Sequence, residues 1–206
     1  MPRSERVELK MIRGSLEYLV VLFLSILCAP LMAVIAIAIK LDSPGPVFFI
    51  QPRAGKNGRI FNMIKFRSMR VHSGKELIQE SDKRISRWGH FLRKSSLDEI
   101  PQFFNILKGE MRVIGPRAAL PEQAQHYSAF QRKRLTVKPG LTGMVAVCGG
   151  HLLTWPQRIR WDVWYVRHQS FWLDLWIAWK TVLLLITGRP LVGKNGISEE
   201  FTKKHA

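Results

Sequence analysis

The stretch YLVVLFLSILCAPLMAVIAIAI, residues 18–39, carries no charged side chain, and Ser25 is its only small polar residue. About 20 apolar residues are enough for a helix to cross the hydrocarbon core of a bilayer, so this stretch is long enough to enter a membrane. Pro30 lies in its middle, where the missing N–H and the ring predict a bend or a break in a helix.

Three interpretations of this stretch compete: a secretory signal peptide, a spanning helix with a proline kink, and a re-entrant helix. A re-entrant helix breaks at Pro30 and leaves on the side where it entered. The basic residues around the stretch are Arg3, Arg6, Lys10 and Arg13 before it, and Lys40, Arg53, Lys56, Arg59, Lys65, Arg67 and Arg70 after it. A spanning helix should have asymmetric flanks, so two basic flanks favour two cytoplasmic ends and the re-entrant interpretation.

The composition predicts a protein that holds anions. The chain has 32 Lys+Arg against 15 Asp+Glu, a net charge of +17. Its two cysteines, Cys28 and Cys148, form no disulfide framework, and no Cys/His spacing indicates a structural metal. We expect two parts: a membrane helix in residues 1–41 and a catalytic domain with interfacial helices in residues 42–206.

Short apolar runs in the middle of the chain predict mixed secondary structure. Residues 47–50 and 60–64 are typical of strands, and the turn signal at 55–58 between them predicts a hairpin. A helix capped by Ser96 or Asp98 should run to residue 107, and a second should span about 121–134. The fold class expected is therefore α+β.

The last third of the chain alternates tryptophan with basic residues. These are Trp155, Trp161, Trp164, Trp172, Trp176 and Trp179 among Arg158, Arg160, Arg167 and Lys180. Tryptophans and cations on amphipathic helices are typical of a surface in the headgroup layer of a membrane. Each tryptophan taken alone could equally belong to the core, but their concentration favours interfacial helices.

The adjacent acids Asp98 and Glu99 stand out in this basic chain, because Arg93 and Lys94 lie just before them. Nearby positive charge lowers the pKa of a carboxyl group, and an ionised carboxylate among anion-binding groups can act as a nucleophile toward phosphorus. On composition alone, two acids at the start of a helix are more simply explained by the helix dipole.

A resemblance changes that balance. The motif LDEIPQ at 97–102 is similar to the core motif of the monotopic phosphoglycosyl transferases, the bacterial sugar transferase family. Other segments match the family in the same order: SPGPVFF (43–49), QPRAG (51–55), KFRSM (65–69), GEM (109–111), GPR (115–117) and KPGLTG (138–143). Six ordered blocks are a far more specific signal than one short motif.

The resemblance implies an enzyme that moves a phosphosugar from a UDP-sugar to polyprenyl (undecaprenyl) phosphate. It implies Asp98 as the nucleophile, Glu99 as its catalytic partner, and Lys65, Arg93 and Arg117 near the substrate. Mg²⁺ on Asp98 and Glu99 is the expected cofactor, since it binds one or two carboxylates together with substrate phosphates. A covalent aspartyl-phosphosugar intermediate would form and UMP would leave.

The resemblance also implies a place in the cell, the cytoplasmic face of the bacterial inner membrane. A monotopic protein there, with a re-entrant helix broken at a proline, would catalyse the first membrane step of glycoconjugate assembly. The expected partners are the UDP-sugar, polyprenyl phosphate and anionic membrane lipid. The oligomeric state is left open, a homo-oligomer included.

Three positions depart from the family pattern. Ala29 precedes Pro30 where relatives often have serine, and Ala118 follows Arg117 where a proline is usual. Gly150 stands where relatives often carry an arginine, which leaves the sugar and the glycan pathway undetermined. His151 or Arg158 are the nearby candidates to replace that arginine, and neither is favoured.

The rival function is a membrane-anchored basic module that binds anionic lipid or nucleic acid without catalysis. Nucleic-acid binding does not explain residues 18–39, so no nucleic-acid partner is expected. Lipid binding alone does not explain Asp98 and Glu99 in their motif.

Overall fold

The computed structural model describes residues 3–69 and 85–187, apart from the side chains of residues 3–13 and 151. Arg70 and the side chains of Arg3, Arg6, Lys10, Arg13 and His151 therefore lie outside the described residues. The strands are β1 (Phe48–Ala54), β2 (Ile60–Phe66), β3 (Arg112–Ile114) and β4 (Gly140–Thr142). The helices are α1 (Arg3–Asp42), α2 (Arg87–Lys94), α3 (Gln102–Leu107), α4 (Pro121–Gln125), α5 (Ala129–Arg132), α6 (Met144–Val147), α7 (Trp155–His168) and α8 (Phe171–Thr187). Short 3-10 turns are η1 (Lys56–Gly58), η2 (Leu97–Glu99), η3 (Lys133–Thr136) and η4 (Gly150–Leu152). This mixture of helices and small sheets confirms the α+β class.

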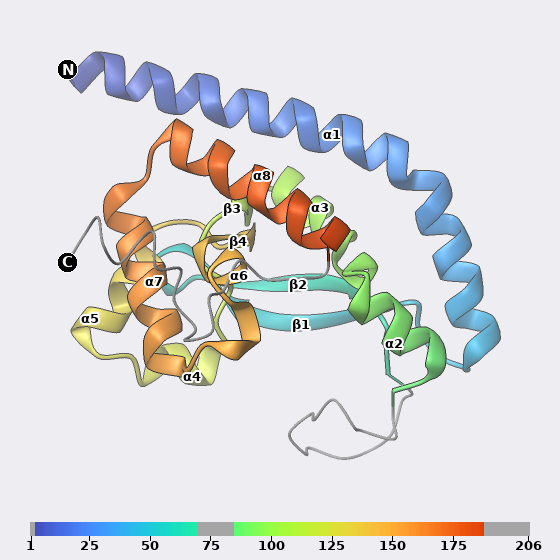
Figure 1. Ribbon diagram of the computed structural model, residues 1–206. Coiled ribbons are helices and arrows are strands. Elements are labelled where there is room, and N and C mark those ends of the chain that lie inside the picture. Colours follow the sequence, from blue (N-terminus) through green and yellow to red (C-terminus); the bar gives the residue numbers. More distant parts are fainter. Residues whose placement is uncertain (1–2, 70–84, 188–206) are drawn as a thin grey trace.

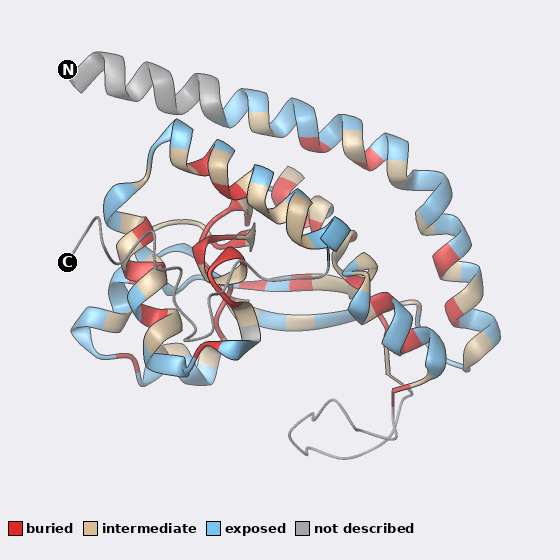
Figure 2. Cartoon of the chain, viewed as in Figure 1, coloured by how far each residue is buried: buried red, intermediate tan, exposed pale blue. Residues whose placement is uncertain are grey.

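The helix α1 runs along one side of the molecule, over α8 and α3 (Figure 1). Its part from Gly14 to Asp42 is long and apolar enough to cross a membrane, by length and composition. Most of its described length between Gly14 and Asp42 is coloured as exposed or intermediate in Figure 2, and Phe23 and Ile26 are 66% and 68% exposed. Such a helix buries little of its apolar surface against its own chain, as a membrane-embedded helix would.

Of the bend or break expected at Pro30, a break is not present, because α1 continues through this residue. The ribbon of α1 instead bends before its C-terminal end (Figure 1). A proline inside a helix removes one hydrogen bond and crowds the preceding turn, which bends a helix without interrupting it. The return of α1 to the side where it entered stays a prediction.

Two contacts fix α1 to the rest of the protein. In the first half of α1, Glu17 accepts hydrogen bonds from Arg112 Nε at 2.9 Å and from Nη2 at 2.8 Å, and the amide of Val113 donates to the same carboxylate. At its C-terminal end, Arg67 binds the main chain that leaves the helix. Polar contacts in its first half and at its C-terminal end therefore set the position of α1 against the rest of the protein.

The predicted hairpin is confirmed and is longer than expected. The strands β1 and β2 pair antiparallel from Phe48 opposite Phe66 to Ala54 opposite Ile60. Asn57, in the turn between them, has a φ of 56°, a left-handed conformation that asparagine adopts more readily than most residues. Strand β2 carries Lys65 near its end, which places this cation close to the acidic pair.

The second sheet consists of the short parallel strands β3 and β4, paired at Arg112 with Gly140. The two backbones approach closely, because a Cβ on Gly140 would lie 2.1 Å from the nitrogen of Gly115. Glycine is therefore required here for packing. The segment after β3 is held in place and carries Arg117.

The helix predicted at 121–134 is wrong in extent. The structure has α4, a separate α5, and then η3. Ser128 starts α5 with a capping box, in which its hydroxyl accepts from the amide of Gln131 and the Gln131 side chain accepts from the amide of Ser128. This local start signal divides the segment into two short helices.

The tryptophans of α7 and α8 divide between two environments. Trp161, Trp164 and Trp176 pack against the core cluster that contains Tyr165 and Ile177. The exposed ones are Trp155, Trp172 and Trp179, at 41%, 75% and 60%. Only the three exposed tryptophans can therefore contribute to the expected interfacial surface.

Candidate active site

The acidic pair lies in η2, between α2 and α3, and does not begin a helix as expected. Helix α3 starts only at Gln102, after Pro101. Ser96, just before η2, has a φ of 56°, and this left-handed residue separates the turn from α2. Asp98 therefore does not lie at the N-terminus of an α-helix, and the capping expected of it is wrong.

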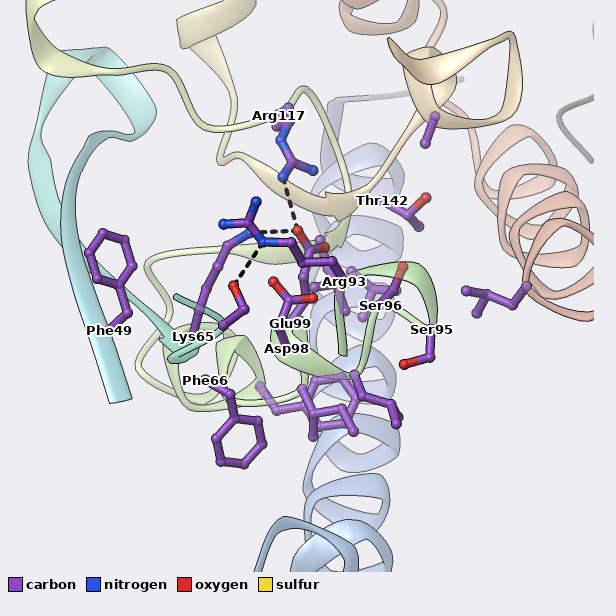
Figure 3. Close-up of a pocket in the computed structure, with 18 of the residues that line it drawn as sticks. Phe49, Lys65, Phe66, Arg93, Ser95, Ser96, Asp98, Glu99, Arg117 and Thr142 are labelled. Carbon is purple, nitrogen blue, oxygen red and sulfur yellow. Dashed lines mark hydrogen bonds and ion pairs between the residues drawn. The ribbon is translucent and has the colours of Figure 1, made fainter. Parts of the chain in front are cut away.

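Glu99 is held by two cations that are far apart in the sequence. Its Oε1 accepts from Lys65 Nζ at 2.6 Å and from Arg117 Nη2 at 2.9 Å (Figure 3). Lys65 comes from β2, and Arg117 from the segment after β3. The structure thus brings together three of the residues that the family motifs indicated.

These cations determine the charge of Glu99. Burial opposes its ionisation, but Arg117 and Lys65 outweigh burial and lower the pKa of Glu99 to about 2. Glu99 is therefore a fixed anion at neutral pH, and one of its oxygens is already occupied by both cations.

Asp98 behaves differently, and the prediction that neighbouring cations lower its pKa is wrong. Burial raises the pKa of Asp98 and outweighs the attraction of Lys65, while the charge of Glu99 raises it further. Among the described residues, no side chain donates a hydrogen bond to its carboxylate. The two adjacent carboxyl groups are thus driven in opposite directions, which is typical of acids with different roles in one site.

Arg93 faces the same site from the last turn of α2, and its Nε donates to Ser68 Oγ at 2.8 Å. Its charge also favours the ionised form of Asp98. Together with Lys65 and Arg117, it makes the surroundings of the acidic pair cationic.

Arg53 on β1 also faces this site, although it was not among the predicted site residues. Its Nη2 donates to Gln51 Oε1 at 2.7 Å, and burial together with the nearby Arg117 lowers the pKa of Arg53 to about 10. The QPRAG motif at 51–55 was the available signal, since Arg53 is the only cation in it.

These residues line one end of a cleft of about 1490 Å³. The polar end contains Arg53, Lys65, Arg93, Asp98, Glu99 and Arg117. The other end lies between α1 and α8 and is lined by Val20, Val21 and Leu24 from α1 and by Ala178, Val182 and Leu185 from α8. The cleft therefore combines an anion-binding end with an apolar end that runs along the long helix.

Gly150, where relatives often carry an arginine, lies outside the cleft lining. Neither Gly150 nor Arg158 is among the described residues that line the cleft, and Arg158 donates from Nε to the oxygen of Leu153. Gly150 has a φ of +54°, with open space where a Cβ would be. Arg158 thus supports the local backbone and gives no sign of replacing the family arginine.

Comparison with known proteins agrees with the motifs. The family described as Bacterial sugar transferase matches residues 9–188. The UDP-glucose:undecaprenyl-phosphate glucose-1-phosphate transferase of Xanthomonas campestris pv. campestris is 46% identical over 172 residues, 76% of this chain and 35% of that protein. The UDP-N-acetylgalactosamine-undecaprenyl-phosphate N-acetylgalactosaminephosphotransferase of Aeromonas hydrophila is 42% identical over 174 residues, 79% of this chain and 40% of that protein.

A shorter relative matches along nearly its whole length. The uncharacterized sugar transferase EpsL of Bacillus subtilis (strain 168) is 35% identical over 175 residues, 84% of this chain and 87% of that protein. The two longer relatives extend well beyond the matched part, and this chain covers 35% and 40% of their full lengths. The family match nevertheless extends over most of the chain and includes the cleft and its acidic pair. This chain belongs to the bacterial sugar transferase family.

Proposed function

We propose that this protein transfers a phosphosugar from a UDP-sugar to polyprenyl (undecaprenyl) phosphate and releases UMP. The observation that supports this best is the single cleft that joins a cationic, carboxylate-bearing end to an apolar end along α1. A diphosphate donor suits the first end, and an isoprenoid phosphate needs both. The names of the Xanthomonas and Aeromonas relatives describe reactions of this kind.

The proposed reaction has two displacements at one phosphorus. A carboxylate oxygen of Asp98 attacks the sugar-bearing β-phosphorus of the donor, and the bond from that phosphorus to the bridging oxygen of UMP breaks. A phosphate oxygen of the polyprenyl phosphate then attacks the same phosphorus and breaks its bond to Asp98. The products are UMP and a polyprenyl diphosphosugar, and Asp98 is regenerated as a carboxylate.

The environment of Asp98 suits a nucleophile. Its carboxylate accepts no hydrogen bond from a described side chain, so no such bond has to be broken before attack. Burial raises its pKa, which makes the ionised form more basic and more reactive than an exposed aspartate. The charges of Lys65 and Arg93 favour the ionised form of Asp98 and attract the phosphates of the donor.

Glu99 is the less suitable nucleophile of the pair. Its Oε1 is bound by both Lys65 and Arg117, and its low pKa makes it a weak base. Its fixed negative charge instead holds these two cations at the polar end of the cleft, where they can contact the donor diphosphate. We assign Glu99 the role of catalytic partner.

The acidic pair also fits a magnesium ion. Among the described residues there is no group of three or more metal-ligand side chains, so substrate and water would complete the coordination. Mg²⁺ commonly binds through one or two carboxylates together with substrate phosphates. Asp98 and the second oxygen of Glu99 can supply the carboxylate ligands. When bound, the ion would neutralise charge that develops on the diphosphate.

The proposed location is the cytoplasmic face of the bacterial inner membrane, with a monotopic topology. The exposed apolar surface of α1 and the exposed tryptophans of α7 and α8 support membrane association. The cleft reaches α1, so an acceptor whose tail lies in the bilayer could place its phosphate at the acidic pair without leaving the membrane. Anionic lipid would assist docking of this basic chain, by about 1 kcal/mol for each well-placed cation.

The experiment that tests this function is intact-protein mass spectrometry after incubation with a panel of UDP-sugars and Mg²⁺. We expect a phosphosugar adduct and free UMP with the wild-type protein, and neither with Asp98→Asn. Asp42→Asn, at the last residue of α1 and outside the cleft lining, serves as the carboxylate control and should still form the adduct. A wild-type protein that is folded and membrane-bound but forms no adduct with any donor would contradict the covalent reaction for the donors tested.

The same proteins distinguish the rival, non-catalytic function. If the chain only binds anionic lipid, Asp98→Asn should co-sediment with anionic vesicles as wild type does, and neither protein should release UMP. An enzyme instead loses turnover with Asp98→Asn while keeping its membrane association.

A further inference from the structure

Arg134, in η3, is a buried cation outside the cleft. It is 5% exposed, and its Nη2 forms an ion pair with Asp162 Oδ2 on α7 at 2.5 Å. Its Nη1 donates to Tyr127 Oη at 2.8 Å, and its guanidinium lies 5.7 Å from the ring centres of both Tyr127 and Trp155. Ion pairing, a hydrogen bond and two aromatic rings thus fix the plane of this guanidinium.

The same guanidinium reaches the site through the main chain. Arg134 Nη2 donates to the carbonyl oxygen of Arg117 at 2.8 Å, and Arg117 in turn contacts Glu99 through its side chain. The main-chain oxygens of the next two residues also have donors. Ala118 O accepts from Arg53 Nη1 at 3.2 Å, and Ala119 O accepts from the amide of Ala54 at 2.9 Å.

Three consecutive carbonyls, at 117–119, are therefore held by donors from two different parts of the fold. Arg53 and Ala54 belong to the hairpin, whereas Arg134 belongs to η3 and is held by α7. The Arg117 side chain is itself 64% exposed, so packing around its guanidinium does little to orient it. Its direction toward Glu99 depends instead on where its backbone is held.

We propose that Arg134, held by Asp162, is a positioning residue for the reaction: it fixes the backbone of Arg117 so that the Arg117 guanidinium stays on Glu99 and the donor phosphates. This inference rests on the proposed function. Asp162 and Tyr127 fix Arg134, and Arg134 fixes Arg117. Arg134 touches no reacting atom in this scheme, and all of its effect on turnover passes through Arg117.

A merely structural role for Arg134 makes a different prediction. Loss of a buried ion pair would then lower the amount of folded protein, and the turnover of each folded molecule would not change. Val163→Ala on α7 is the matched control, because Val163 is a buried neighbour of Asp162 in sequence and carries no charge. This change removes packing from the same helix and leaves the ion pair in place.

The kinetic test uses Arg134→Met, Arg134→Lys, Asp162→Asn and Val163→Ala, with turnover measured per folded molecule. We expect Arg134→Met to lower kcat about tenfold or more. Arg134→Lys should recover only part of the loss, because lysine keeps the charge but cannot bind Asp162, Tyr127 and the Arg117 carbonyl together. Val163→Ala should keep kcat within about twofold of wild type.

A double-mutant cycle with Arg117→Ala then tests the path of the effect. If Arg134 acts through Arg117, adding Arg134→Met to Arg117→Ala should lower kcat by less than about twofold. Full additivity of the two losses would overturn the proposal, and so would a wild-type kcat per folded molecule in Arg134→Met.

Amide hydrogen exchange tests the same link without turnover. Peptides that cover 115–119 should exchange faster in Arg134→Met than in wild type, and Val163→Ala should leave their exchange unchanged. Unchanged exchange in Arg134→Met would overturn the proposal. A wild-type protein without transferase activity would instead overturn the proposed function, and the exchange result would then decide alone whether Arg134 holds the Arg117 segment.

Discussion

Arg67 Nη2 lies 2.6 Å from the main-chain oxygen of Ser43, so the residue that follows β2 holds the chain where it leaves α1. Arg67 Nη1 also donates to the oxygen of Pro44 at 2.7 Å, and Nη2 reaches the oxygen of Ile39 at 3.3 Å. One buried guanidinium thereby binds the Ile39 carbonyl in the last turn of α1 and two carbonyls in the chain that leaves the helix. It does so two residues from Lys65.

Arg67→Lys should therefore destabilise the protein although it keeps the charge. An ammonium group cannot donate to three separated carbonyls in a fixed plane, and each partly buried hydrogen bond to a charged group that is lost costs about 1–3 kcal/mol. We expect a loss of roughly 2–3 kcal/mol, a decrease in Tm of about 4–10 °C for a chain of this length. Thermal unfolding in detergent measures it. Arg160→Lys, at an exposed position of α7, is the control, and an equal decrease there would contradict the prediction.

Asp98→Asn should raise stability at neutral pH. The folded pKa of Asp98 lies above its unfolded value, so the charged form is penalised in the fold, and asparagine removes that penalty. The gain is present above the folded pKa and disappears as pH falls below the unfolded value of ~3.9. We expect a rise in Tm of roughly 2–4 °C at pH 7 to 8 that shrinks toward pH 4. A rise that is the same at every pH would contradict this explanation.

For Glu99 we expect the stability of the fold to depend on pH in the opposite direction. Its folded pKa of about 2 lies below the ordinary value of 4.5, so its ionisation stabilises the fold above that value. The contribution is lost as pH falls from about 4.5 to about 2. Glu99→Gln should therefore lower Tm at pH 7 and lose less stability than wild type on acidification. Parallel melting curves from pH 7 to pH 3 test this, and curves that keep a constant separation would contradict it.

Asn105→Ala should be among the most destabilising single changes in the part of the chain that follows α1. Asn105 is fully buried, and its side chain joins α3 to β2 by accepting from the amide of Ile64 at 3.0 Å and donating to the oxygen of Asn62 at 2.8 Å. Its Nδ2 also donates to Glu110 Oε2. We expect a loss of about 2–4 kcal/mol in chemical denaturation, because several buried partners lose their hydrogen bonds together. Asn62→Ala, at an exposed side chain, should cost less than about 0.5 kcal/mol.

Ala178→Phe tests the apolar end of the cleft. The added ring would occupy the space between α8 and α1 that we assign to the isoprenoid tail. We expect kcat/KM for long-chain polyprenyl phosphate to fall roughly tenfold, while the phosphosugar adduct forms at the wild-type rate. Leu183→Phe, on α8 but outside the cleft lining, is the matched control. A slower adduct in Ala178→Phe alone would place the donor, rather than the acceptor, at this end.

Local sequence patterns predicted the elements whose cause is local. The hairpin follows from two apolar runs around a turn signal, and the membrane-length helix from residues 18–39. The helix at 121–134 failed because the capping box of Ser128 and Gln131 was not recognised. The start of α3 failed because Ser96 adopts a left-handed conformation that its residue type does not indicate.

In the candidate site, too, sequence motifs predicted some features and missed those that depend on the folded structure. Motif matches indicated Lys65, Glu99 and Arg117, and the structure places them within hydrogen-bonding distance. The direction of the pKa of Asp98 depends on how much water the folded chain excludes, which no local pattern contains. Arg134 and Asp162 are paired by tertiary packing between η3 and α7. No local sequence motif around either residue predicts that they form an ion pair.

The contact of Glu17 with Arg112 has a consequence for the order of synthesis. These residues are 95 positions apart, so Glu17 leaves the ribosome roughly 5–20 s before its partner at ordinary rates of translation. During that interval α1 has its apolar length but not the cation that binds its carboxylate. Glu17 lies just before the uncharged stretch 18–39, where the headgroup layer can hydrate it until Arg112 is made. The nascent helix can therefore meet the bilayer first, and the rest of the chain can fold onto it afterwards.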